Sequence, residues 1–235
     1  MKKVSFKLNK KLDKDMINVF LDLKQGGLDF SGCVLNPNPE LKKVIDKKDK
    51  DIKKEINKYV NRIYEKKKET LDKKVKEFNQ RWGKLEKSYF NLIKDIFKLK
   101  TLPNHKYTGY LSIINCGPRF LEDRSFQVFY KKPNDSMYVT MHEILHFFFY
   151  DYVFKNYPKF RKLDPNKEIL WELAEVFNSV ILAESEFKKV HKQKRDWSYP
   201  AHRKYLKNLK KLWQESKCID TWINKGFDYL KNKKY

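Results

Sequence analysis

Apolar side chains recur at steps of three, four and seven residues between positions 41 and 100. They are Ile45, Ile52, Ile56, Tyr59, Val60 and Ile63, followed by Leu71, Val75, Phe78, Trp82, Leu85 and Tyr89. The residues between them are mostly Lys, Glu and Asp, with no Pro and one Gly, Gly83. This spacing lines one face of an α-helix, so we predict two long amphipathic helices that could pair as a hairpin. Such helices would either pack against the fold or form an arm that gates or covers an active site.

Residues 1–40 show no such period, because Gly26-Gly27, Gly32 and Asn36-Pro37-Asn38-Pro39 interrupt them. They predict a short helix or strand followed by a loop.

The spacing of apolar residues changes again at 107–131. Two runs there are short and rich in β-branched or aromatic residues, at 110–114 and 125–130, with a turn at 115–118 between them. We predict a small antiparallel sheet.

Helical periodicity returns after this sheet. Asn134, Asp135 and Ser136 are candidate caps for a helix that runs to about Phe154. A second helix is predicted at roughly 166–187 and a third from about Ala201. The predicted fold is α+β and mostly helical. Its organisation would be an N-terminal helical segment at 1–100 and a domain at 101–235 that joins the sheet to these helices.

The composition narrows the choice of partners. The chain has 53 Lys and Arg against 30 Asp and Glu, a net charge of +23. Such a surface attracts nucleic acid or acidic protein, but the lysines are spread along the chain among acidic residues, so nucleic-acid binding is the less favoured reading. Cys33, Cys116 and Cys218 are far apart and suggest no disulfide framework. Residues 1–7 lack a signal-peptide core and no apolar run is long enough to span a bilayer, so a cytoplasmic protein without membrane contact is expected.

The helix at 134–154 carries His142-Glu143-Ile144-Leu145-His146, an HExxH motif. Residues four apart lie on the same helical face, so His142 and His146 can bind one metal ion. Glu143 then lies beside that ion, where it can accept the proton of a water that the metal activates. This combination is typical of zinc-dependent peptide hydrolysis. Phe149 and Tyr152 occupy the positions where a longer form of the motif has Gly and a third His.

A third ligand is therefore expected from the next helix. Glu168, Glu172, Glu175 and Ser179 form a narrow polar strip there between apolar flanks. Carboxylates caught between apolar surfaces need a partner, and a metal ion is one. Spacing from His146 leaves both Glu172 and Glu175 open as the ligand.

With these residues the sequence resembles the gluzincin metallopeptidases, and over residues 107–215 the small bacterial members called minigluzincins. The resemblance implies a Zn²⁺ ion bound by His142, His146 and a Glu, with Glu143 as general base. It favours Glu175, because the segment Leu173–Leu182 looks like the glutamate helix of such proteins.

The resemblance also implies an edge strand that pairs with an extended peptide substrate, here Phe126, Val128 and Tyr130. Gluzincins use a His or Tyr beyond the ligand Glu to stabilise the oxyanion, and Tyr199 and His202 are the candidates. The expected function is zinc-dependent cleavage of peptides or proteins, possible also in a latent form. The alternative is a basic protein that binds nucleic acid or protein and has a non-catalytic metal site.

Overall fold

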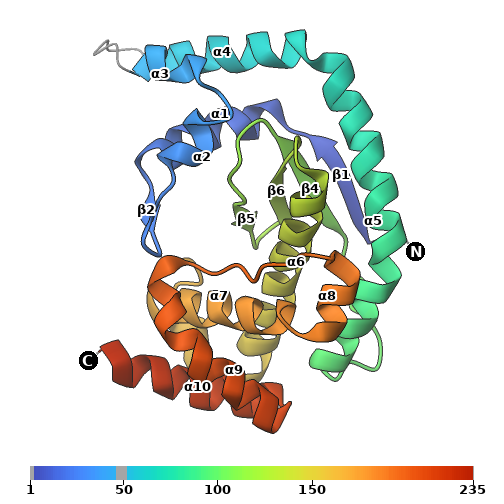
Figure 1. Ribbon diagram of the computed structural model, residues 1–235, viewed down its shortest axis with the longest axis vertical. Coiled ribbons are helices and arrows are strands. Elements are labelled where there is room, and N and C mark those ends of the chain that lie inside the picture. Colours follow the sequence, from blue (N-terminus) through green and yellow to red (C-terminus); the bar gives the residue numbers. More distant parts are fainter. Residues whose placement is uncertain (1–2, 46–51, 235) are drawn as a thin grey trace. The chain divides into compact units, whose positions relative to one another are not determined.

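The computed structural model describes residues 3–45 and 52–234, and it is α+β and mostly helical, as predicted (Figure 1). Residues 1–2, which belong to the N-terminal stretch considered above, lie outside the described residues, as do residues 46–51 of the predicted helical segment and residue 235.

The chain divides into two compact units. One comprises Met1–Glu86 and His105–Thr140, and the other comprises Lys87–Asn104 and Met141–Tyr235. The predicted division at residue 100 differs from this, because the strand β1 (Val4–Leu8) pairs with β4 (Tyr107–Ser112). Removing residues 1–100 would therefore take a strand out of the sheet.

The four-stranded sheet of the first unit has the order β1-β4-β6-β5. Strands β1, β4 and β6 (Ser125–Phe129) are parallel, and only the short β5 (Arg119–Phe120) runs antiparallel to β6. The predicted antiparallel sheet was therefore wrong in direction. Residues 113–124 do not form a tight hairpin turn; they are a crossover long enough to return β6 parallel to β4. Strands β2 (Lys24–Gln25) and β3 (Leu28–Asp29) form a separate hairpin.

Side chains of α5 cover the outer edge of β1. Asn79 accepts a hydrogen bond from the backbone N–H of Phe6 (3.1 Å) and donates one to the Phe6 carbonyl (3.0 Å). Glu86 Oε1 accepts from the backbone N–H groups of Lys3 and Val4, each at 2.9 Å. These groups are thereby withheld from pairing with another strand.

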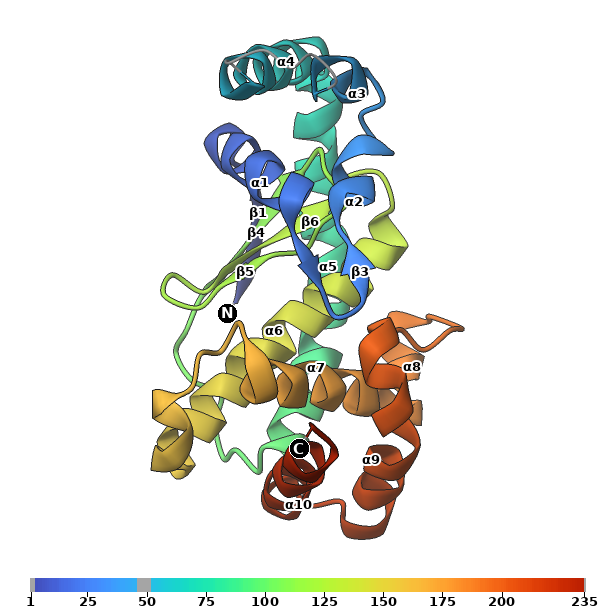
Figure 2. The same cartoon turned by 90° about the vertical axis from the view of Figure 1, so that its left-hand side faces the viewer.

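The long helices predicted between residues 41 and 100 are present. The helices of this half of the chain are α1 (Lys10–Asp22), α2 (Ser31–Leu35), α3 (Glu40–Ile45), α4 (Ile52–Lys66) and α5 (Lys68–Ile96). Helices α4 and α5 turn a corner where they meet and do not fold back as a hairpin (Figures 1 and 2). Backbone hydrogen bonds continue through the corner, from Lys67 N–H to Ile63 O at 3.0 Å and from Leu71 N–H to Lys67 O at 2.9 Å. No loop is therefore present to reverse the chain.

The C-terminal half is built from helices. They are α6 (Pro133–Asn156), η1 (Pro158–Lys162), α7 (Glu168–Leu182), α8 (Ser185–His191), η2 (Pro200–His202), α9 (Arg203–Ser216) and α10 (Ile219–Lys234). The single helix predicted at 166–187 is two, with a break at Ala183 and Glu184. Helix α10 was not predicted, although Ile219, Trp222 and Ile223, all fully buried, have helical spacing.

Gly109 of β4 lies in register between Phe6 of β1 and Phe126 of β6. A Cβ at this position would lie 2.6 Å from the Phe6 ring and 3.1 Å from the Phe126 ring. We expect Gly109→Ala to lower the free energy of unfolding by about 1–3 kcal/mol, because both rings are buried and must shift. Gly83→Ala is the control, since a Cβ there meets nothing within 4 Å, and it should raise stability by about 0.5–1 kcal/mol. Urea unfolding measures both, and equal stability of the two variants would contradict the packing described.

Asp13 of α1 is fully buried beside the sheet, where four donors reach its carboxylate. They are Ser112 Oγ (2.5 Å), Tyr64 OH (2.7 Å), Gln127 Nε2 (2.8 Å) and the backbone N–H of Ile113 (3.2 Å). Burial raises the pKa of Asp13 from 3.8 to about 6, although these hydrogen bonds act in the opposite direction. The hydrogen-bonded carboxylate ties α1 and α4 to the sheet.

This raised pKa predicts a pH dependence of stability. The folded protein binds the proton more tightly than the unfolded chain, so the Asp13 contribution falls as the pH rises from about 4 through 6. The loss is on the order of 3 kcal/mol when it is complete. Asp13→Asn cannot titrate, so the excess stability of the wild type over this variant should shrink by about that amount between pH 4 and pH 7. Urea unfolding at three pH values measures it, and a constant difference would contradict the assignment.

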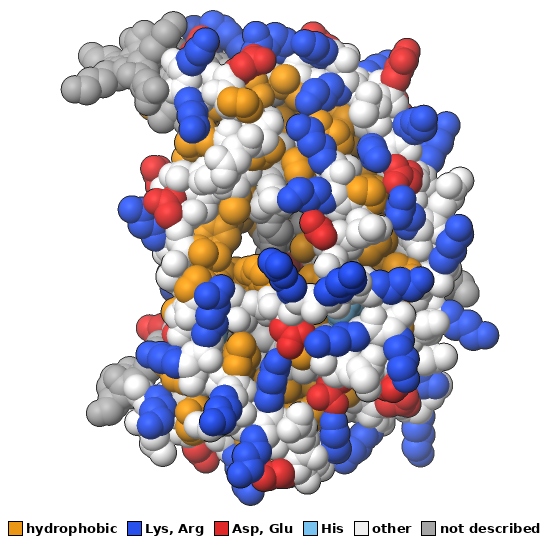
Figure 3. Space-filling model, viewed as in Figure 1, with side chains coloured by type: hydrophobic (Ala, Val, Ile, Leu, Met, Phe, Trp, Pro, Cys, Tyr) orange, Lys and Arg blue, Asp and Glu red, His pale blue; other side chains and the backbone are white. Residues whose placement is uncertain are grey.

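The basic charge is dispersed on the face that Figure 3 shows. Lys and Arg side chains lie across this face with acidic and apolar side chains among them. Ion pairs account for part of the pattern; Asp196, for example, is held by Lys188 at 2.7 Å and Lys210 at 2.8 Å. Within residues 3–45 and 52–234, no helix combines the length and the apolar character that crossing a bilayer requires.

Candidate metal centre

Helix α6 positions the two histidines of the HExxH motif. Pro133 is its first residue, a position where the missing N–H of Pro costs no helical hydrogen bond. The helix is apolar on nearly all sides around the motif, and Met141, Ile144 and Leu145 are fully buried. His142 is 7% exposed and His146 is 0% exposed. Their Nε2 atoms lie 3.0 Å apart, as the spacing of four residues predicts.

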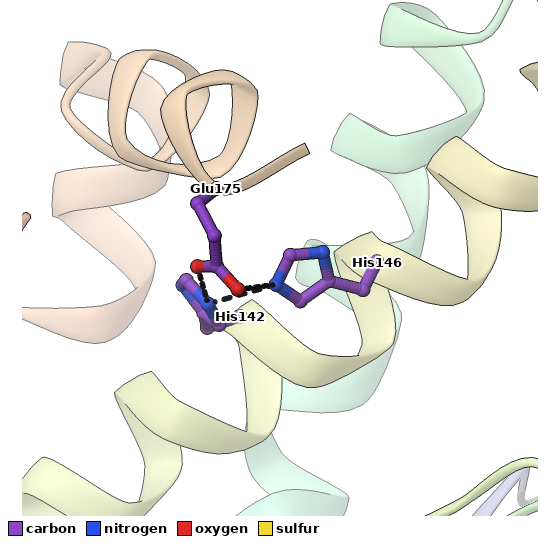
Figure 4. A group of neighbouring side chains, drawn as sticks. All are labelled: His142, His146 and Glu175. Atoms are coloured by element: carbon purple, nitrogen blue, oxygen red, sulfur yellow. Dashed lines mark hydrogen bonds and ion pairs between the residues drawn. The ribbon is translucent and has the colours of Figure 1, made fainter. Parts of the chain in front are cut away.

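Helix α7 brings Glu175 to both histidines (Figure 4). Glu175 Oε2 lies 3.1 Å from His142 Nε2, and Glu175 Oε1 lies 3.2 Å from His146 Nε2. The carboxylate is 3% exposed. Glu172, the alternative third ligand, is half-buried and lies outside the group. Between Glu172 and Glu175, which spacing alone left open, the geometry selects Glu175.

The three side chains could hold a metal ion. In the part of the chain that the structure describes, theirs is the one group of three His, Cys, Asp or Glu side chains close enough for this, with ligand atoms within 4.8 Å of one another. Tetrahedral ligands at about 2.0–2.1 Å from an ion are about 3.4 Å apart, close to the separations found here. Two imidazole nitrogens that face each other at 3.0 Å while both face a carboxylate fit a shared cation better than a set of ordinary hydrogen bonds.

The electrostatics of Glu175 agree with an ionised ligand. Burial by itself raises the pKa of this carboxyl, but the attraction and hydrogen bonds of His146 and His142 outweigh burial and hold the pKa well below its usual value. This direction favours the ionised form of the carboxyl group.

Glu143, the expected general base, lies next to His142 on α6 and is 5% exposed. Sequence reasoning put it beside the metal, and its position in the chain and its burial are compatible with that role. Its action as a base stays a prediction.

Tyr199 and His202, the expected oxyanion donors, belong to an aromatic cluster that reaches the histidines through Trp197. The Trp197 ring lies 6.0 Å from the His142 ring and 4.7 Å from the Tyr199 ring. His202 is 2% exposed and lies 5.0 Å from the Trp171 ring, which is 5.2 Å from the Tyr199 ring. The structure therefore places Tyr199 and His202 near α6 and α7, the helices that carry the candidate ligands. Their chemical role stays a prediction.

Trp197 is a further residue of this cluster, which the sequence analysis did not assign to the site. Its side chain is 42% exposed although it contacts a buried ligand histidine. The ion pairs of Asp196 with Lys188 and Lys210 anchor the segment that carries it. The sequence offered one indication of this position: Trp197 lies two residues before Tyr199, a candidate oxyanion donor.

The expected substrate-binding strand needs correction. Phe126, Val128 and Tyr130 were predicted to lie on an edge strand, but β6 lies between β4 and β5. Phe126 and Val128 are fully buried and Tyr130 is 4% exposed. The reason is that β1 and β5, which the sequence did not predict as strands of this sheet, occupy its edges. These side chains belong to the core of the first unit.

His191 lies in a lysine-rich stretch of the sequence, yet its side chain is buried. It is 6% exposed, with Nε2 2.9 Å from the Leu182 carbonyl and Nδ1 accepting a hydrogen bond from the Gln193 N–H at 2.9 Å. Nε2 thus joins the end of α8 to the end of α7, and Nδ1 binds the segment that follows α8. His105, also in a polar stretch of the sequence, is half-buried.

No protein-family model matches the chain, and no curated protein or solved structure is detectably similar to it. The site must therefore be interpreted from its own geometry.

Proposed function

We propose that the protein is a zinc-dependent metallopeptidase. The observation that carries the proposal is the buried convergence of His142, His146 and Glu175, with Glu143 between the histidines in the motif. Two imidazoles and one carboxylate leave a fourth position for water or substrate, as catalytic zinc sites do. A structural zinc site would have all four positions filled by protein and is usually rich in Cys, whereas no Cys belongs to this group.

Each residue has a definite task in this proposal. His142, His146 and Glu175 would hold Zn²⁺, which supplies Lewis acidity to polarise a peptide carbonyl and to lower the pKa of a water. Glu143 would accept a proton from the attacking water and return it to the departing amine. Tyr199 is the better placed candidate to donate a hydrogen bond to the oxyanion, because it is half-buried while His202 is almost completely enclosed.

A cleavage assay tests the proposal. Zinc-loaded protein is incubated with a mixture of unstructured peptides, and products are identified by mass spectrometry. We expect new termini that disappear when a chelator removes zinc and return when zinc is restored. Absence of cleavage by folded, zinc-loaded protein in a broad peptide mixture, or cleavage insensitive to the chelator, would contradict the proposal.

A further inference from the structure

Asn178 of α7 lies one helical turn beyond Glu175 and is fully buried. Its Nδ2 donates a hydrogen bond of 2.8 Å to the backbone carbonyl of His142. In an α-helix that carbonyl also accepts the N–H of the residue four positions later, here His146. The His142 carbonyl therefore lies in the helical turn that carries both histidines. Asn178, on the helix that carries Glu175, donates its side-chain hydrogen bond to this carbonyl.

Burying the Asn178 side chain costs free energy of folding, and an apolar side chain would pack in its place without this cost. Asn178 Oδ1 is buried and has no hydrogen-bond partner among the described residues. A buried acceptor in that state destabilises the fold relative to an apolar side chain of the same size. Leu would avoid the cost and fill a similar volume. What Asn supplies and Leu cannot is the N–H donor toward α6.

The neighbouring polar residue of α7 makes a different kind of contact. Ser179 Oγ donates to the carbonyl of Glu175 on its own helix at 2.9 Å. This bond is local and links no second helix. Ser179 lies four residues from Glu175 in sequence and Asn178 three, yet Ser179 does not join α7 to α6 by this bond.

We propose that Asn178 is a positioning residue for the metal centre. Its hydrogen bond to the His142 carbonyl fixes α7 against α6 at the separation at which Glu175 meets both imidazoles. The inference rests on the proposed metal site. Groups outside the ligand shell that orient ligands in this way typically contribute about 10–100-fold to metal affinity.

The test compares the full-length wild type with Asn178→Leu and with the matched control Ser179→Ala. Zinc affinity is measured by competition with a chromophoric chelator, and stability by thermal unfolding of the metal-free proteins. We expect Asn178→Leu to bind zinc about 10–100-fold more weakly. Its metal-free form should unfold at the wild-type temperature or above it, because the buried acceptor is gone. Ser179→Ala should keep wild-type affinity.

A purely structural role would give a different pattern. Affinity of Asn178→Leu within about twofold of wild type would overturn the inference, and so would an equal loss in Ser179→Ala. Asn178→Ala gives a second reading if the Leu variant does not fold, with the same expected loss of affinity. The visible absorption of the Co²⁺-substituted proteins should change in the Asn178 variants and not in Ser179→Ala. A wild type that binds no zinc would overturn the proposed function first, which keeps the two failures distinguishable.

Discussion

Glu143→Gln is expected to lower kcat/KM for peptide cleavage by about 10²–10⁴-fold while zinc stays bound. Gln has the size of Glu but cannot accept a proton, so the variant removes general-base catalysis and leaves His142, His146 and Glu175 intact. Steady-state kinetics on a peptide found to be cleaved measure the loss, and elemental analysis of the same sample measures the zinc.

Glu172→Gln is the matched control for this variant. Glu172 is a half-buried carboxylate on α7 that lies outside the metal-ligand group, so its replacement should change kcat/KM little. Equal activity of Glu143→Gln and wild type would exclude Glu143 as the base. Salt-sensitive DNA binding that survives Glu143→Gln, in a protein that cleaves no peptide, would favour the nucleic-acid alternative, since the net charge is +23.

His146→Ala should weaken zinc binding by more than the roughly 10–100-fold that loss of an orienting group causes, because a ligand itself is removed. The loss of zinc binding should also lower the stability of the folded protein in the presence of zinc. Zinc at about a thousand times its Kd stabilises a folded protein by about 4 kcal/mol. For a chain of this size that corresponds to a rise in Tm of roughly 8–16 °C.

Thermal unfolding with and without zinc measures this difference. The wild type should show the rise in Tm, and His146→Ala should show little or none at the same zinc concentration. His105→Ala is the control, because His105 is half-buried and lies outside the ligand group. An equal zinc-dependent rise in His146→Ala would show that the ion binds elsewhere.

The spacing of residues along the chain correctly predicted those features that form within a single helix. The apolar stripe that ends at Tyr89 and the HExxH spacing both indicate which side chains share a helical face, and α4, α5 and α6 follow from them. Glu175 could be foreseen because a polar strip between apolar flanks on α7 had to meet a partner. The choice over Glu172 needed the tertiary structure, since both spacings reach the histidines.

The features that were missed depend on contacts distant in sequence. Nothing in residues 4–8 reveals that they pair in parallel with residues 107–111, and nothing in residues 119–120 reveals the pairing of β5 that moves β6 away from the sheet edge. Asn178 looks like an ordinary polar residue of a helix until its bond to His142 is seen. The position of Trp197 at the site is likewise evident only from its contact with the His142 ring.

The zinc content of the protein, purified without added metal and again after dialysis against zinc, tests the central claim most directly. Elemental analysis should give close to one zinc per chain for the wild type and for Glu143→Gln, and almost none for His146→Ala. A folded wild type that holds no zinc even after dialysis would contradict the metallopeptidase account and leave His142, His146 and Glu175 as a buried polar cluster without a metal.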